Sequence, residues 1–263
     1  TPEEARLQGV ESAATAPSAG LDSCPTAPQP DLTVKLASGW YCTSERSGVS
    51  PGGDGAIDYL SRAMLEPGDR VLVPSPGFSY YRMSTRHHHG EITEYELSKA
   101  EGFEQTPETV LDAYDGERIV HVTSPHNPTG TEWTRAEIRT LLNAVDDGTL
   151  VVVDEAYGEY SEQPSSIGLL DEYDNLAVPR TFSKAYGLAG LRLGYGLVPA
   201  EWADAYKRVN TPFAVSTLAC RAGLAALEAT AHVQTPVATT PRAREYHHRH
   251  PRAQALGARR KLR

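Results

Sequence analysis

Three short apolar segments of this chain each lead directly into a group of polar residues, and this pattern constrains the fold more than any other. The segments span residues 118–123, 150–153 and 176–182, and their β-branched, apolar character is typical of buried strands. In open α/β sheets, ligands bind at the carboxyl ends of parallel strands. The sequence therefore predicts an α/β fold, a mainly parallel sheet flanked by helices, with a binding site along one edge.

Helical patterns separate the predicted strands. Thr134 and Glu137 form a capping box, and apolar residues then recur at helical spacing over 138–145. A glycine-rich turn at 51–55 opens another helical stretch at 56–65. Further strands are predicted at 70–74 and 191–198, and further helices at 201–209 and 216–228.

The last of the three polar groups contains Lys184, one of five lysines in the chain. Lysine is protonated at neutral pH, and it becomes a nucleophile when it is desolvated or held in a Schiff base with a carbonyl cofactor. Ser183 and Arg192 flank it, and this pair suits a phosphate group. Asp154, at the end of another apolar strand, suits a buried cation. Together these residues indicate a site for pyridoxal 5'-phosphate (PLP).

The spacing of these residues resembles that of the fold type I PLP-dependent aminotransferases, and among them the histidinol-phosphate aminotransferases. Asn127, in the motif SPHNPTG, precedes Asp154 by 27 residues, and Asp154 precedes Tyr157 by 3 and Lys184 by 30. Arg192 follows Lys184 by 8 residues. The resemblance covers roughly residues 48–232. It implies the large domain of that fold, and a cytoplasmic enzyme that forms a homodimer.

The resemblance also implies a role for each matching residue. Lys184 would bind PLP and act as the general base once an incoming amine displaces it. Asp154 would pair with the ring nitrogen, and Tyr157 and Asn127 would hydrogen-bond the phenolic oxygen of the ring. Phe78 stands where the family places an aromatic ring, usually tyrosine, against the cofactor. The phosphate would be held by Ser183, Arg192 and the glycine turn of Gly53, Asp54 and Gly55.

Each of these residues also has a purely structural interpretation when taken alone. Phe78 is also compatible with a place in the core, and Tyr157 with a packing role. Asp154 is also compatible with a helix cap, and Arg192 with a surface ion pair. The glycine turn at 53–55 is also compatible with a plain capped turn. The matching spacing of the motifs favours the PLP site over these alternatives.

The first functional hypothesis is transamination between histidinol phosphate and 2-oxoglutarate in histidine biosynthesis. Threonine-phosphate decarboxylases share the same core and also take phosphorylated amines, so a PLP lyase of that kind is the alternative. A third interpretation is a PLP-binding fragment without catalytic activity. In the first two cases the partners are small molecules, a phosphorylated amine or amino acid and a 2-oxo acid.

Charge and composition exclude several other classes. The net charge of −9 conceals an acidic body, because residues 233–263 carry eight Lys and Arg but one Glu. An acidic body argues against nucleic-acid binding. No apolar run is long enough to span a membrane, and no secretory pattern opens the chain. The three cysteines, Cys24, Cys42 and Cys220, form no CxxC pair and are interpreted as free thiols.

Histidines cluster at 87–89 and again in the tail at His247, His248 and His250. Adjacent side chains on a helix or strand point in different directions, so the three at 87–89 cannot converge on one metal ion. A solvated surface or loop is the expected setting for both clusters, and no metal site is predicted.

Both ends depart from the family pattern. Residues 1–47 are interpreted as a flexible or degraded arm, although Lys35–Ser38 (KLAS) resembles the opening of the family's LASNENP segment. Residues 233–263 are interpreted as a basic, disordered tail, with the small C-terminal domain largely missing. A natural arm, a truncation and an out-of-frame end would each explain these features. We expect this chain alone to bind PLP weakly and to have little transaminase activity.

Overall fold

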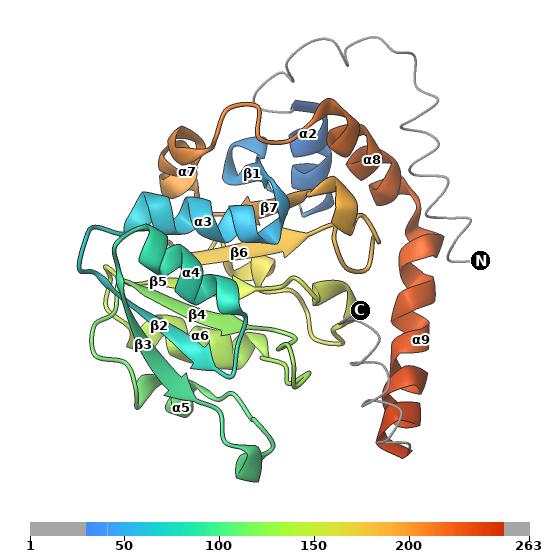
Figure 1. The fold of residues 1–263 in the computed structure, drawn as a ribbon. Coiled ribbons are helices and arrows are strands. Elements are labelled where there is room, and N and C mark those ends of the chain that lie inside the picture. The colour runs from blue at the N-terminus through green and yellow to red at the C-terminus, as the bar shows by residue number, and fades with distance from the viewer. Residues whose placement is uncertain (1–29, 41, 250–263) are drawn as a thin grey trace.

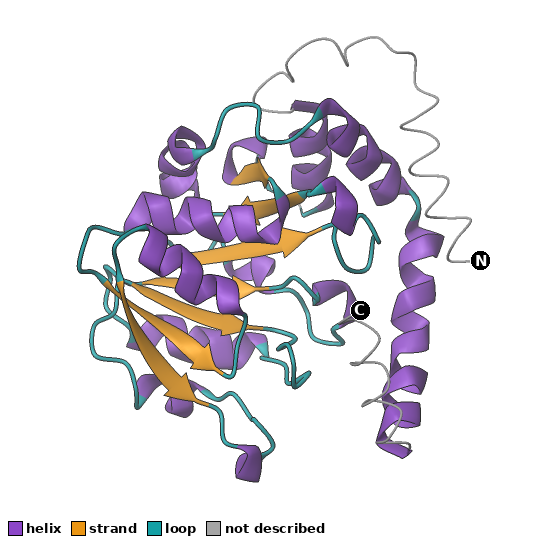
Figure 2. Cartoon of the chain, in the orientation of Figure 1, coloured by secondary structure: helices purple, strands orange, loops and turns teal. Residues whose placement is uncertain are grey.

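The computed structural model describes residues 30–40 and 42–249, and in them one seven-stranded sheet forms the centre of the molecule (Figures 1 and 2). The order is β1-β7-β6-β5-β4-β2-β3. Strands β6, β5, β4, β2 and β3 are parallel, and β7 runs antiparallel to both of its neighbours. The predicted α/β class is confirmed. The strands are β1 Ser47–Ser50, β2 Arg70–Ser75, β3 Glu91–Glu96, β4 Ile119–Thr123, β5 Leu150–Asp154, β6 Leu176–Thr181 and β7 Gly194–Leu197.

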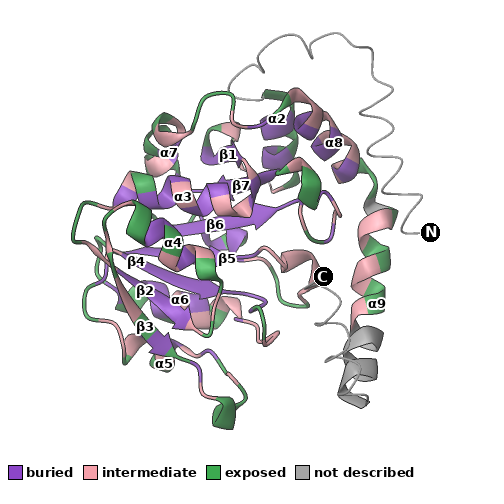
Figure 3. Cartoon of the chain, viewed as in Figure 1, coloured by how far each residue is buried: buried purple, intermediate pink, exposed green. Residues whose placement is uncertain are grey.

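Helices cover both faces of the sheet. One face packs against α3 Gly52–Met64, α4 Ser79–His87 and α7 Ala203–Val209, and the other against α2 Pro30–Gly39, α5 Pro107–Leu111, α6 Arg135–Ala144 and α8 Thr217–Glu228. Successive strand residues face opposite sides of the sheet. Val152 therefore packs in the core on the α3 side, and Val151 and Val153 pack in the core on the α6 side. Because both faces are covered, β4 and β5 are buried along their whole length (Figure 3).

Short 3₁₀ turns connect several of these elements. They are η1 Ser44–Arg46, η2 Lys99–Glu101, η3 Gly158–Tyr160, η4 Ser166–Leu169, η5 Ala189–Leu191 and η6 Ala200–Trp202. The first two residues of the helix predicted at 201–209 belong to η6. Within the described part of the chain, every helix is too short or too polar to span a lipid bilayer. Cys42 and Cys220 are free thiols, and Cys24 lies outside the described residues.

Local sequence signals explain where several helices begin. At α6 the predicted capping box is present, since the Thr134 amide donates to Glu137 Oε2 at 2.7 Å and the Glu137 amide donates to Thr134 Oγ1 at 3.2 Å. At α8 the Ser216 hydroxyl accepts from the Ala219 amide at 3.1 Å. Helix α3 begins at Gly52 rather than at residue 56, so the glycine turn is itself the first turn of the helix.

The N-terminal boundary predicted at residue 48 is wrong. Helix α2 belongs to the domain, because Leu32 and Leu36 lie one turn apart and are buried in the core. The segment Lys35–Ser38, matched above to the opening of the family's LASNENP segment, lies in this helix. Helix α2 was not predicted because it has only ten residues and follows a proline-rich stretch. Residues 1–29 of the predicted arm lie outside the described part.

The disorder predicted from residue 233 is also wrong, over 233–249. Helix α9 Thr230–Arg249 continues from the end of α8 (Figure 1), and it contacts η3. Threonine hydroxyls bond carbonyls about one turn back, as Thr235 does to Ala231 at 3.2 Å and Thr240 to Pro236 at 2.7 Å. The helix has no marked apolar stripe, so the periodicity used for the sequence prediction could not reveal it. Residues 250–263 lie outside the described part.

The start of α3 packs unusually close to β7, and Gly194 permits this approach. A Cβ at Gly194 would lie 2.3 Å from the Gly52 carbonyl carbon and 2.6 Å from the Gly53 nitrogen. Gly194→Ala is therefore expected to destabilise the chain by about 1–3 kcal/mol, as overpacking does, and to lower the urea midpoint. Gly190→Ala is the matched control, because its new Cβ would meet nothing within 4 Å. Equal midpoints for the two variants would contradict this packing.

Candidate active site

A cavity of about 230 Å³ opens at the carboxyl ends of β4, β5 and β6, beside the first turn of α3. The predicted site residues Gly53, Asp54, Phe78, Asn127, Asp154, Tyr157, Ser183, Lys184 and Arg192 all line it. Gly55 does not line it. Its lack of a side chain makes room for Pro51 instead, since a Cβ there would lie 2.6 Å from the proline ring.

Asp154 is the buried acid of this cavity. It ends β5, and its two carboxylate oxygens accept from the Tyr81 hydroxyl at 2.7 Å and the Ala156 amide at 2.9 Å. Burial raises the pKa of Asp154, and the hydrogen bonds from Tyr81 and Ala156 oppose that shift. A cation bound in the cavity would favour the ionised carboxylate further.

Tyr81 is a site residue that the sequence analysis missed. It lies on α4, fully buried, and its hydroxyl is 2.8 Å from Thr123 Oγ1 as well as bonded to Asp154. Its ring stacks on His121 at 4.4 Å between centres, and burial lowers the pKa of His121 to about 3, so that imidazole is neutral. The spacing of Phe78 and Tyr81, nearly one helical turn apart after SPG, was the available signal.

Lys184, Tyr157 and Asn127 come together from three different loops. The Lys184 ammonium lies 5.2 Å from the centre of the Tyr157 ring, a cation–π distance. The Asn127 amide donates to the Tyr157 hydroxyl at 3.3 Å. The Ser124–Pro125 and Asn127–Pro128 peptide bonds are cis. The chain thus brings an amine, a phenol and an amide to one side of the cavity.

Arg192 and the first turn of α3 form the opposite side. Its guanidinium bonds Asp54 Oδ1 at 2.6 Å and lies 3.5 Å from Ser183 Oγ. The backbone of Arg192 has φ +51°, a left-handed conformation that is costly for a residue with a side chain. Gly52, at φ +90°, allows the close approach, since a Cβ there would lie 2.3 Å from Arg192 Nη2.

This second side suits an anion. The first turn of an α-helix has free backbone N–H groups and a positive dipole end, and here a guanidinium and a hydroxyl lie beside it. The cavity therefore has an anion-binding side, a side with an amine, and a buried carboxylate. A flat ligand with an anionic group, a carbonyl and a cationic ring nitrogen fits that set of donors and acceptors.

The histidine cluster at 87–89 does not line this cavity. His88 Nε2 is 3.0 Å from Asp58 Oδ1 on the neighbouring helix α3. His247 and His248 belong to α9, and His250 lies outside the described residues. Among residues 30–40 and 42–249, no group of three His, Cys, Asp or Glu side chains is placed to hold a metal ion.

Comparison with known proteins gives a consistent picture. Residues 9–256 match the family model of class I and II aminotransferases. The chain is 61% identical over 226 residues to histidinol-phosphate aminotransferase of Haloarcula marismortui, which covers 86% of this chain and 63% of the relative. It is 60% identical over 220 residues to the enzyme of the same name from Haloferax volcanii, covering 84% and 61%. The chain thus spans a little over three fifths of these relatives.

The fold matches a solved structure of the same kind. The crystal structure of histidinol-phosphate aminotransferase from Sinorhizobium meliloti in complex with pyridoxal-5'-phosphate superposes with a TM-score of 0.81 and 24% identity. The match covers 92% of this chain and 65% of that chain. At this identity the likeness supports the fold.

The hydrogen bond between Tyr81 and Asp154 is testable in the ligand-free chain. Tyr81→Phe removes a donor from a buried carboxylate and is expected to cost about 1–3 kcal/mol at pH 7, measured by urea unfolding. The lost donor lowers the pKa of Asp154 in wild type, so the folded-state pKa is higher in the variant. The difference in free energy of unfolding between wild type and Tyr81→Phe is therefore full above the pKa that Asp154 has in either folded protein. It narrows as pH falls through these two pKa values.

The control is the same substitution in an Asp154→Asn background. There the acceptor is neutral, so Tyr81→Phe is expected to cost less and its cost should not depend on acid pH. If Tyr81→Phe cost the same free energy of unfolding at neutral and acid pH in the chain with Asp154 intact, Tyr81 would not be a donor to an ionised Asp154.

Proposed function

This chain belongs to the class I and II aminotransferase family, and from that premise we propose that its cavity binds PLP and supplies the cofactor site of a histidinol-phosphate aminotransferase. One observation carries the proposal: an amine, a buried carboxylate and an anion-binding helix terminus surround a single cavity. The relatives named above support the choice of substrate. PLP supplies an electron sink that stabilises negative charge on a substrate carbon.

Asp154 is the proposed partner of the ring nitrogen. Its carboxylate is buried and accepts two hydrogen bonds, and it also lines the cavity. A protonated ring nitrogen beside it would offset the cost of burying the charge, and the carboxylate would in turn hold that proton in place. Tyr81 fixes the carboxylate, so a loss of Tyr81 acts on the cofactor through Asp154.

The proposed phosphate site is the Arg192 side of the cavity. Arg192 and Ser183 provide side-chain donors, and the amides of Gly53 and Asp54 belong to the first turn of α3. Gly55, which does not line the cavity, is not among the proposed donors. The Asp54 carboxylate pairs with Arg192 at 2.6 Å, which limits the local positive charge. Guanidinium and helix-terminal N–H groups together are well suited to a dianion.

The remaining residues orient the ring. Tyr157 and Asn127, which bond each other at 3.3 Å, are the proposed partners of the phenolic oxygen. Phe78 lines the cavity with 39% of its surface exposed, and its ring meets Tyr81 edge-on at 5.6 Å. It is the proposed platform for the ring of the cofactor, since face stacking needs no hydroxyl.

Lys184 is the proposed attachment point and base. Its Nζ would hold the cofactor through the aldehyde group and, once freed by an incoming amine, would be placed to take a proton from the substrate carbon next to the amine. Lys184 lines the same cavity as Asp154, so the proposed base and the proposed partner of the ring nitrogen would act in one site. The proposed substrates are histidinol phosphate and a 2-oxo acid.

We also propose that the whole enzyme is a cytoplasmic homodimer. Met83 and Phe213 are large apolar side chains that remain 46% and 56% exposed in the single chain. A second subunit that covered them would remove this apolar surface from water. The family resemblance drawn from the sequence points the same way.

The attachment of PLP is tested by reduction and mapping. The chain mixed with PLP is expected to show a visible absorbance band, and borohydride should fix the cofactor on Lys184. Lys184→Ala should abolish the label, whereas Lys207→Ala, on the distant helix α7, should leave it unchanged. A label found on Lys207, or no label at all, would show that the cofactor site is misassigned.

The substrate is tested in a single turnover with the PLP-loaded chain. Histidinol phosphate is expected to bleach the visible band slowly, in keeping with the low activity expected of this chain alone, and a 2-oxo acid should restore the band. O-phosphothreonine serves as the matched phosphorylated amine. Release of carbon dioxide from it, with no response to histidinol phosphate, would favour the decarboxylase instead.

A further inference from the structure

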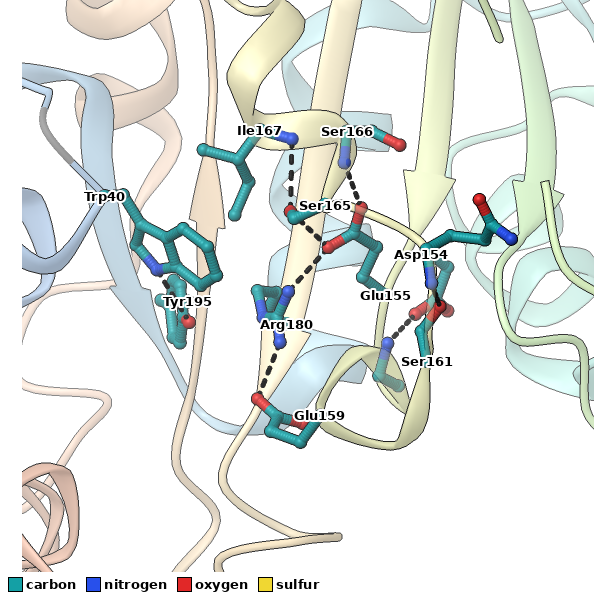
Figure 4. A network of polar contacts seen from close by, with 12 residues as sticks. Trp40, Asp154, Glu155, Glu159, Ser161, Ser165, Ser166, Ile167, Arg180 and Tyr195 are labelled. Carbon is teal, nitrogen blue, oxygen red and sulfur yellow. Dashed lines mark hydrogen bonds and ion pairs between the residues drawn. The ribbon is translucent and has the colours of Figure 1, made fainter. Parts of the chain in front are cut away.

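Behind the cavity, one buried guanidinium contacts two carboxylates of the loop that follows β5 (Figure 4). Arg180 lies on β6 with 4% of its side chain exposed. It donates to Glu155 at 2.5 Å and to Glu159 at 2.7 Å. The Trp40 ring covers the guanidinium, with 4.7 Å from its carbon to the ring centre. Arg180 does not line the cavity.

Further contacts fix this loop on the neighbouring strand. Glu155 accepts from the Ser165 hydroxyl and the Ser166 amide, both at 2.6 Å, and its own amide donates to the Pro179 carbonyl at 3.1 Å. Gly158 packs directly on the guanidinium, because a Cβ there would lie 2.7 Å from Arg180 Nη1. The loop therefore has one position relative to Arg180.

Along this loop, residues that line the cavity alternate with residues that contact Arg180. Asp154 and Tyr157 line the cavity, whereas Glu155 and Glu159 reach back to Arg180. On the cavity side, the Tyr157 hydroxyl has a single hydrogen bond among the residues that the structure describes, the long one from Asn127 at 3.3 Å. The position of Tyr157 therefore depends on the loop, and the loop depends on Arg180.

We propose that Arg180 is a positioning residue that sets the separation of Asp154 and Tyr157 from Lys184. Lys184 follows Arg180 by four residues on the same segment, so one guanidinium ties both sides of the cavity together. The cofactor part of this inference rests on the proposed function. The geometric part does not, because the contacts exist in the ligand-free chain.

The charges of the cluster favour positioning over simple stability. Two carboxylates surround one guanidinium, and Arg180 Nε and Glu159 Oε2 have no hydrogen-bond partner in the described part of the chain. Well-packed apolar residues would avoid this cost of burial. Arginine reaches the two carboxylates through two separate nitrogens, Nη1 to Glu155 and Nη2 to Glu159, whereas lysine keeps the charge but has one nitrogen in their place.

The test compares Arg180→Lys with a matched control, Arg46→Lys. Arg46 is also buried and ion-paired, to Asp171, and donates to the Leu170 carbonyl at 2.6 Å, but it lies away from the cavity. Both variants are expected to lose stability. Only Arg180→Lys should weaken PLP binding, by at least about tenfold, and shift the pH midpoint of the visible band. Equal affinities and midpoints in the two variants would overturn the proposal.

A second readout uses no cofactor. Hydrogen exchange at the amides of 156–160 in the ligand-free chain is expected to be at least about tenfold faster in Arg180→Lys and unchanged in Arg46→Lys. If wild type takes no PLP but this difference appears, the proposed function fails and the positioning role stands. If Arg180→Lys does not fold, Glu159→Gln replaces it, and unchanged exchange at 156–160 in that variant refutes the role.

Discussion

A carboxylate buried at the end of an apolar strand is the constraint on which the rest of this site depends. Asp154 follows four buried apolar residues of β5, and burial raises its pKa. Tyr81 from α4 and the Ala156 amide satisfy its oxygens. Helix α4, strand β5 and the loop after β5 must therefore keep one mutual arrangement, and the cavity forms where they meet.

The opposite side of the cavity depends on close backbone packing. Gly52 and Gly194 let the first turn of α3 approach β7 and Arg192 more closely than any side chain would allow. The same approach places the free N–H groups of that turn next to the guanidinium of Arg192, a residue whose backbone is in a left-handed conformation. The buried Asp154 carboxylate and the free N–H groups at the start of α3 thus give the two ends of the cavity opposite chemical character.

Sequence patterns predicted the parts of this structure that local residues determine. Strands β4 to β6 were recognisable because both faces are buried, and α6 because its capping box is local. Strand β3 was missed because this edge strand, EITEYE, is largely exposed and charged. The spacing of motifs predicted Lys184, Asp154 and Arg192 as site residues, and all three line one cavity. Tyr81 and Arg180 were missed because their roles depend on partners 73 and 25 residues away, contacts that no local pattern encodes.

The proposed cofactor site depends most directly on Asp154 holding a protonated ring nitrogen. The decisive measurement is nitrogen-15 NMR of the chain loaded with PLP that is labelled at the ring nitrogen, at neutral pH. The account predicts the chemical shift of a protonated nitrogen in wild type and of an unprotonated one in Asp154→Asn. An unprotonated nitrogen in wild type, or the same shift in both proteins, would contradict it.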